Sequence, residues 1–245
     1  MQSNLIMCAP MTTSAPAQHD SIPTLADKIE HTLLSPLTTR ADIDRHCAEA
    51  RTHLLFGVCV SPQWVARAYE LLKETPVAIV TVVGFPLGAN TSSSKAFECA
   101  TAVRQGASEI DMVIALGALK AGDRFGVRDD IAAVVKAASG KPVKVILETA
   151  YLRDAEKQLA CALAEEAGAQ FIKTSTGYAR QEWVAGPGLS LGATIHDVRL
   201  IRSCVGERLR IKASGGIRGA DFARELVAAG ADRIGTSAGP ALIGR

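Results

Sequence analysis

The stretch that decides the fold is residues 143–174, which read VKVILETAYLRDAEKQLACALAEEAGAQFIKT. An apolar run (143–148) is followed by a segment in which Ala and Leu recur at helical spacing (153–167). Gly168 then precedes a second apolar run (170–174). Two short strands joined by a helix of this length are typical of a parallel pair with a crossover helix.

The same unit recurs from Lys28 onward. Eight strands are expected, at Asp27–His31, Phe56–Val60, Ala78–Val83, Glu109–Ile114, Val143–Glu148, Gln170–Thr174, Leu209–Ala213 and Asp232–Gly235. Helices are expected at Thr39–Thr52, Ser92–Gln105, Arg124–Ala138, Arg153–Ala167, Thr194–Val205 and Ala220–Ala229. Thr38 is the expected cap of the first helix, and glycines at 106, 140, 168 and 230 end helices.

This spacing predicts an α/β fold of the (β/α)8 TIM-barrel type. The strand centres recur about every 29 residues, and eight such units in roughly 220 residues match the usual barrel size. A doubly wound sheet is the rival, but no G-x-G-x-x-G follows the first strand. We expect a single barrel domain over residues 24–245, preceded by a flexible N-terminal extension over residues 1–23.

Composition excludes several classes of function. Hydrophobic residues make up 48% of the chain, which suits a folded core, and the formal charge of +2 is too balanced for nucleic-acid or membrane-surface binding. Apolar runs are too short for a membrane span. The first 23 residues contain no Lys or Arg, whereas a signal peptide begins with a positively charged region. The six cysteines are scattered and do not pair with histidines at metal-ligand spacing. We therefore expect a reduced, cytoplasmic protein without a metal site.

Ionisable residues interrupt several of the apolar strands. Lys144, Lys173 and Lys212 fall in the fifth, sixth and seventh strands, and Asp111 falls in the fourth. An unpaired buried ammonium is costly, so burial or a neighbouring cation favours the neutral, nucleophilic amine. The alternative is that the lysines are structural partners of Asp111 and Glu148. Three lysines near the ends of adjacent strands, where barrel active sites lie, favour catalysis.

Glycine-rich segments follow the last three strands. They read TSTG (174–177), SGGIR (214–218) and GTSAG (235–239). Backbone N–H groups in such loops make anion sites, and barrels commonly bind phosphate after strands seven and eight. These segments predict a phosphate site.

Six motifs in this order resemble the deoxyribose-phosphate aldolases over residues 28–242. They are EHTLL (30–34), VCVSP (58–62), GFPLGAN (84–90), EIDMV (109–113), FIKTSTG (171–177) and IKASGG (211–216). The resemblance implies reversible retro-aldol cleavage of 2-deoxy-D-ribose 5-phosphate to D-glyceraldehyde 3-phosphate and acetaldehyde, in deoxyribose phosphate catabolism. It also implies a class I lyase without a cofactor or metal, whose expected assembly is a homodimer.

The resemblance also assigns roles to individual residues. Lys173 is the Schiff-base lysine, Lys212 is the cation that keeps it partly unprotonated, and Asp111 acts with a water as proton shuttle. The implied substrate-binding residues are Glu30, Cys59, Thr176, Gly177, Gly215, Gly216, Gly235, Thr236 and Ser237. Glu30 stands where many relatives have Asp, and Cys59 also fits a simple packing role.

The chain departs from the family pattern near Tyr178. Some relatives have lysine there, and some carry a terminal tyrosine that assists proton transfer, whereas the tyrosines here are 69, 151 and 178. Two alternatives stay open: a related Schiff-base aldolase for another phosphorylated sugar, and a barrel that only binds sugar phosphates. Intact Lys173, Lys212 and Asp111 argue against the second.

Overall fold

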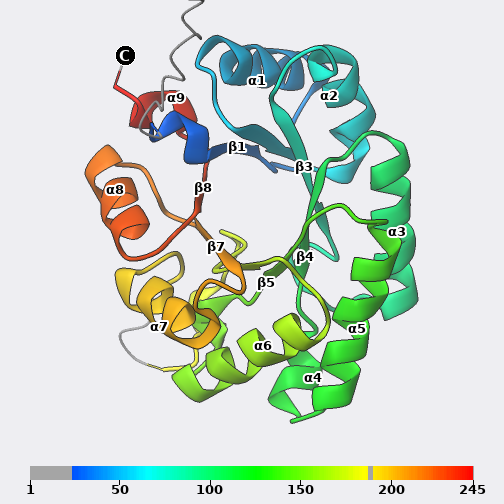
Figure 1. The fold of residues 1–245 in the computed structure, drawn as a ribbon. Coiled ribbons are helices and arrows are strands. Elements are labelled where there is room, and N and C mark those ends of the chain that lie inside the picture. The colour runs from blue at the N-terminus through cyan, green and yellow to red at the C-terminus, as the bar shows by residue number, and fades with distance from the viewer. Residues whose placement is uncertain (1–23, 187–189, 245) are drawn as a thin grey trace, which may run out of the picture.

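Eight parallel strands close into a barrel in the computed structural model, which describes residues 24–186 and 190–244 (Figure 1). Each strand pairs with the next along the chain, and β8 pairs with β1. The strands are β1 (Ile29–Leu33), β2 (Gly57–Val60), β3 (Ala78–Val83), β4 (Glu109–Val113), β5 (Val143–Ile146), β6 (Phe171–Lys173), β7 (Arg210–Ser214) and β8 (Arg233–Thr236). The prediction of a TIM barrel is confirmed.

Helices surround this barrel and connect its strands (Figure 1). They are α1 (Arg40–Thr52), α2 (Val65–Leu72), α3 (Ser92–Arg104), α4 (Leu116–Lys120), α5 (Arg124–Ala137), α6 (Asp154–Glu166), α7 (Ile195–Val205), α8 (Ala220–Ala228) and α9 (Gly239–Leu242). Single 3-10 turns occur at η1 (Ala26–Lys28), η2 (Pro62–Trp64), η3 (Thr149–Tyr151) and η4 (Gln181–Trp183). None of the helices within the described ranges is long and apolar enough to cross a membrane.

Side-chain caps fix where several helices begin. Thr39, and not Thr38, caps α1: its hydroxyl accepts from the Asp42 N–H while the Asp42 carboxylate accepts from the Thr39 N–H. Asp123 and Thr194 cap α5 and α7 in a similar way, each accepting from a backbone N–H three residues on. The four predicted helix-ending glycines all have positive φ angles.

Two expected strands differ from the structure by two residues at an end, whereas the others agree to within one residue. The first was expected at Asp27–His31, but a 3-10 turn occupies residues 26–28 and β1 runs on to Leu33. The fifth was expected to reach Glu148, but β5 ends at Ile146 because Glu148 adopts a left-handed conformation (φ 55°, ψ 67°). Apolar periodicity does not reveal such a local turn of the backbone.

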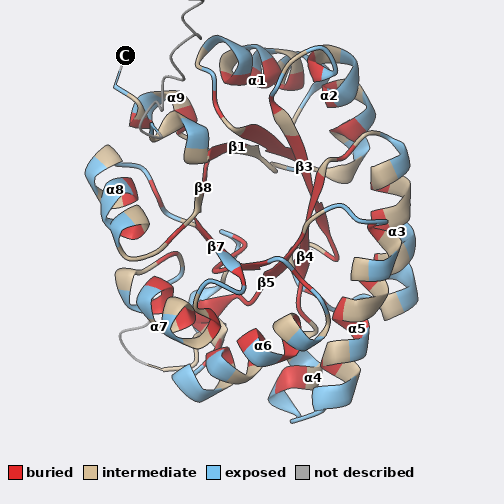
Figure 2. Cartoon of the chain, in the orientation of Figure 1, coloured by how far each residue is buried: buried red, intermediate tan, exposed pale blue. Residues whose placement is uncertain are grey.

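The main hydrophobic core lies between the barrel and its helices (Figure 2). Alternate strand residues such as Val58, Ile110 and Ile172 pack there against helix residues such as Ile131 and Val198. The other strand face points into the lumen of the barrel. The lumen residues therefore decide what the barrel can do.

The lumen has an apolar and a charged part. Cys59, Val80 and Val82 from β2 and β3 form a small separate cluster with Leu34 and Phe85. The strands β4 to β7 and β1 instead contribute buried lysines and carboxylates. Beneath these charges lies Phe171, with the Lys144 ammonium 5.3 Å from its ring centroid.

The expected flexible extension over residues 1–23 lies outside the described residues.

Candidate active site

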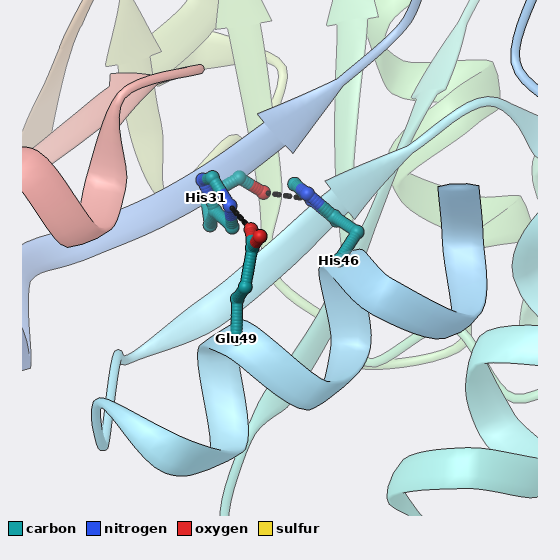
Figure 3. Close-up of side chains that lie close together, drawn as sticks. All are labelled: His31, His46 and Glu49. Carbon is teal, nitrogen blue, oxygen red and sulfur yellow. Dashed lines mark hydrogen bonds and ion pairs between the residues drawn. The ribbon is translucent and has the colours of Figure 1, made fainter. Parts of the chain in front are cut away.

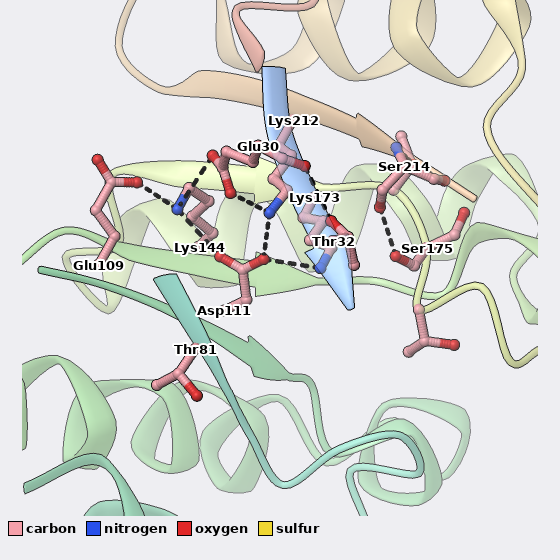
Figure 4. Close-up of polar contacts among 12 residues, drawn as sticks. Glu30, Thr32, Thr81, Glu109, Asp111, Lys144, Lys173, Ser175, Lys212 and Ser214 are labelled. Carbon is pink, nitrogen blue, oxygen red and sulfur yellow. Dashed lines mark hydrogen bonds and ion pairs between the residues drawn. The ribbon is translucent and has the colours of Figure 1, made fainter. Parts of the chain in front are cut away.

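Three lysines and three carboxylates meet in the lumen (Figure 4). Asp111 lies at the centre: its Oδ2 accepts hydrogen bonds from Lys173 Nζ at 2.7 Å and from Lys212 Nζ at 2.6 Å. Its Oδ1 lies 3.0 Å from Lys144 Nζ. Glu30 pairs with Lys212, and Glu109 pairs with Lys144. We call these six residues the lumen charge cluster.

The register of the strands builds this cluster. Lys173 pairs in register with Lys212 on β7 and with Ile146 on β5. Ile146 lies two residues after Lys144, so Lys173 lies closer than Lys144 to the carboxyl ends of the strands. Asp111 pairs with Lys144 across β4 and β5. The period-two alternation then turns all four polar side chains into the lumen. The prediction that the three lysines fall in the fifth, sixth and seventh strands and Asp111 in the fourth is confirmed.

Burial and pairing together set the charge states in the cluster. Burial alone would raise the pKa of Asp111, but Lys144, Lys173 and Lys212 hold that pKa well below its ordinary value. Burial alone would lower the pKa of Lys212, but Asp111 and Glu30 raise it well above the ordinary lysine value. The pKa of Lys144 is likewise raised, since Asp111 and Glu30 outweigh its burial. Asp111 is therefore a carboxylate, and Lys144 and Lys212 are ammonium groups, at neutral pH.

Lys173 is the cluster residue that lines an open cleft. The cleft has a volume of about 220 Å³ and lies at the carboxyl ends of the strands, where barrel enzymes have their active sites. Lys144 and Lys212 lie fully buried beneath it, whereas the Lys173 side chain keeps 3% exposure. The lining residues are Thr32, Leu34, Lys173, Thr176, Gly177, Ser214, Gly215, Gly216, Ile217, Arg218, Gly235, Thr236 and Ser237.

Hydrogen bonds tie the loops around the cleft together. Ser214 Oγ donates to the Ser175 carbonyl at 2.6 Å, and Thr236 Oγ1 donates to the Ile217 carbonyl at 2.7 Å. The loops that follow β6, β7 and β8 therefore hold one another in place. A rigid set of backbone N–H groups of this kind suits an anion.

Gly235 connects the cleft to the charge cluster below it. A Cβ atom at this position would lie 2.9 Å from Lys212 Cε and 3.0 Å from Ser214 Cβ. Lys212 cannot move aside without leaving Glu30 or Asp111. Glycine is thus required by the close approach of the Lys212 side chain.

The structure brings most of the predicted site residues together. Lys173 and seven of the predicted substrate-binding residues line the cleft: Thr176, Gly177, Gly215, Gly216, Gly235, Thr236 and Ser237. Glu30 and Cys59 do not; both are fully buried. Glu30 is a charge partner of Lys212 and Lys144, and Cys59 packs in the apolar part of the lumen, where burial raises the pKa of its thiol.

Sequence reasoning missed several residues of the site. Arg218 lines the cleft and is exposed, with no ion-pair partner among the described residues. Its place at the end of the second glycine-rich segment was the available signal. Glu109 was also missed, and the suggestion that Glu148 pairs with the lysines is wrong: its carboxylate accepts hydrogen bonds from Thr176 instead.

A second polar cluster lies outside the barrel lumen. His31 Nε2 lies 2.9 Å from the Glu49 carboxylate, and His46 Nε2 donates to the His31 carbonyl at 3.0 Å (Figure 3). The two imidazole rings stack with centroids 3.9 Å apart, and one ligand atom each of His31, His46 and Glu49 lies within 4.8 Å of the other two. Hydrogen bonds thus hold both imidazoles in place, and His196 likewise pairs with Asp154.

A lysine-bearing cleft on a closed (β/α)8 barrel suits an aldolase-type lyase, and comparison with known proteins agrees. The DeoC/LacD family of aldolases matches residues 26–245. The deoxyribose-phosphate aldolase of Bdellovibrio bacteriovorus is 51% identical over 219 residues, covering 89% of this chain and 95% of that protein. The deoxyribose-phosphate aldolase of Caldanaerobacter subterraneus is 48% identical over 229 residues, covering 92% of this chain and 95% of that protein.

A solved structure supports the same placement. The tetrameric deoxyribose phosphate aldolase from Aeropyrum pernix superposes with a TM-score of 0.80 at 32% identity, covering 89% of each chain. The protein belongs to the DeoC/LacD family of aldolases and is a lyase.

Proposed function

We propose that this aldolase cleaves 2-deoxy-D-ribose 5-phosphate reversibly to D-glyceraldehyde 3-phosphate and acetaldehyde, through a Schiff base on Lys173. One observation carries the choice of lysine: of the three lumen lysines, Lys173 alone lines the cleft. The relatives named deoxyribose-phosphate aldolase support the choice of substrate. The acceptor-rich phosphate would lie against the loops after β6, β7 and β8.

Lys212 favours the neutral form of the Lys173 amine. Both amines contact one oxygen of Asp111, and Lys212 keeps its proton because Asp111 and Glu30 outweigh its burial. The Lys212 cation repels a second positive charge placed against that oxygen. The neutral amine is the nucleophile that the reaction needs.

The reaction then proceeds in balanced steps. Lys173 Nζ attacks the C1 aldehyde carbon of the open-chain sugar, and the resulting carbinolamine loses water to give an iminium. The C2–C3 bond breaks, its electron pair forms the enamine, and the C3 hydroxyl proton leaves, so that glyceraldehyde 3-phosphate departs. The enamine takes a proton at C2, and water releases acetaldehyde. Asp111, 2.7 Å from Lys173 Nζ, would act with a water as the proton shuttle for the carbinolamine steps.

Borohydride trapping tests the role of Lys173. The protein is incubated with acetaldehyde and borohydride, and mass spectrometry is expected to find the two-carbon adduct on Lys173. Lys173→Arg should lose both the adduct and the release of glyceraldehyde 3-phosphate in a coupled assay, because arginine stays charged. The exposed Lys136→Arg is the matched control and should keep both. An adduct on Lys144 or Lys212 would overturn the assignment.

The cellular setting follows from the proposed reaction. An enzyme that cleaves deoxyribose phosphate serves the breakdown of deoxyribonucleotide sugars, and the composition fits a cytoplasmic location and one barrel domain. The assembly we propose is a homodimer, although the Aeropyrum pernix relative is tetrameric. Light scattering coupled to size exclusion decides between them.

A further inference from the structure

Glu148 is a buried ionisable residue that the proposed reaction does not use. It lies two residues past Ile146, the last residue of β5, and it is 2% exposed. Three described residues other than glycine have positive φ angles, and the other two, Leu54 and Ser139, lie exposed on the surface. A strained backbone persists in a buried place only when its surroundings hold it there, and such sites gather around binding centres.

The side chain of Glu148 holds the segment that follows β6. The Thr176 N–H lies 3.3 Å from Glu148 Oε2, and the Thr176 hydroxyl donates to the same oxygen. Thr176 Oγ1 in turn accepts from the Tyr178 N–H at 2.9 Å. One carboxyl group therefore anchors Thr176 directly and Tyr178 through it, and Gly177 lies between them.

This anchored segment forms one side of the cleft. Thr176 and Gly177 line the cleft beside Lys173. Tyr178 reaches across the mouth of the barrel: its hydroxyl donates to the Leu34 carbonyl at 3.0 Å, and its ring meets Phe85 edge-on at 5.4 Å. Leu34 lines the cleft as well. The position of Thr176 thus determines where Thr176 and Gly177 line the cleft and where Tyr178 contacts Leu34.

On its other side Glu148 borders an apolar cavity. The cavity has a volume of about 430 Å³, and its lining includes Leu87, Leu116, Tyr151, Tyr178 and Trp183. No lysine or arginine of the described chain forms an ion pair with Glu148. Burial raises the pKa of its carboxyl, and the hydrogen bonds from Thr176 and the charge of Lys173 offset this only in part. The direct contacts of the carboxylate are therefore its hydrogen bonds to Thr176.

We propose that Glu148 is the positioning residue that sets the Thr176–Tyr178 segment, and through it the geometry with which the cleft holds the sugar phosphate. This inference rests on the proposed function, because it assigns the phosphate to this cleft. It predicts an effect on phosphate-bearing substrate that is separate from the reactivity of Lys173. A purely structural role of Glu148 would instead affect both alike.

Two substitutions at Glu148 separate these roles. Glu148→Gln keeps an oxygen that accepts from the Thr176 N–H and hydroxyl, whereas Glu148→Ala removes it. We expect Glu148→Ala to raise KM for 2-deoxyribose 5-phosphate by about tenfold or more and to change kcat by less than about threefold. Glu148→Gln should restore KM to within about threefold of the wild type. Trapping of acetaldehyde on Lys173, which involves no phosphate, should proceed at the wild-type rate in both variants.

Thr176→Val tests the same contact from the other partner. It removes the hydroxyl, and it should raise KM in the same way without a further increase when combined with Glu148→Ala. This arm decides the question if Glu148→Ala fails to fold. An unchanged KM in Glu148→Ala, an equal loss of acetaldehyde trapping, or a glutamine variant as impaired as the alanine variant would each overturn the inference. Failure of the proposed function is distinguishable, because the wild-type protein itself would then give no adduct.

Discussion

Removing the Lys212 ammonium should destabilise the protein as well as inactivate it. Lys212 is fully buried and pairs with Asp111 at 2.6 Å and with Glu30. Lys212→Met keeps the length of the side chain and removes the charge. Breaking a buried ion pair from one side typically costs about 3–5 kcal/mol, because the remaining charge is left uncompensated. Lys144 still lies 3.0 Å from Asp111 and 3.5 Å from Glu30, so we expect the lower end, about 3 kcal/mol.

The assay is thermal unfolding at pH 8. For a chain of this size, about 3 kcal/mol corresponds to a fall in Tm of roughly 6–12 °C. The pKa of Lys212 is raised in the folded protein, so its stabilising effect is complete below the unfolded value of 10.5 and is lost only as the pH rises above it. A measurement at pH 8 therefore sees the whole effect.

A second substitution distinguishes charge imbalance from lost packing. Lys212→Met combined with Glu30→Gln removes one charge of each sign, and it should recover at least about 1.5 kcal/mol relative to Lys212→Met alone. Activity should stay lost in both, because the cation beside Lys173 is still missing. A single variant whose Tm stays within about 2 °C of the wild type, or a double variant less stable than the single one, would refute this reasoning.

Three further predictions concern other parts of the protein. Arg218→Met should raise KM for the phosphorylated sugar by about tenfold, because the exposed guanidinium lines the cleft, while acetaldehyde trapping on Lys173 stays unchanged; steady-state kinetics and trapping check this. Gly235→Ala should displace Lys212 and lower the trapping rate by about tenfold or more, whereas the exposed Gly219→Ala, which meets no atom within 4 Å, should not. Burial and the neighbouring His31 lower the pKa of His46 to about 3, so the protein should lose up to about 4 kcal/mol of stability as the pH falls from 6.5 to 3; a His46→Gln variant should show a smaller loss in denaturant titrations.

Strand periodicity carried most of the fold prediction. The apolar runs around Lys144, Asp111 and Lys212 identified the strands that carry these charges. The end of β5 could not be read in this way, since the left-handed turn at Glu148 depends on its contact with Thr176, 28 residues later in the chain. Local patterns contain no record of such a partner.

The same limit applies to the site. The glycine-rich segments indicated the loops of the cleft, because a strand followed by such a segment is a local signal. Glu30 was placed among the substrate-binding residues by resemblance, yet its partner Lys212 lies 182 residues away and turns it into a buried counter-charge. The closure of the barrel decides which residues of a motif line the cleft and which lie buried beneath those residues.

The fixed charges beneath Lys173 have a consequence for any pH–rate profile. Asp111 has a pKa well below 3.8, while Lys144 and Lys212 have pKa values above 10.5. Between these limits the three groups neither gain nor lose a proton, so their charges stay constant. An inflection in the rate across that interval therefore reports on other groups or on the substrate. Because the charges of Asp111, Lys144 and Lys212 stay constant, the titration of the reacting groups can be observed without a contribution from these three.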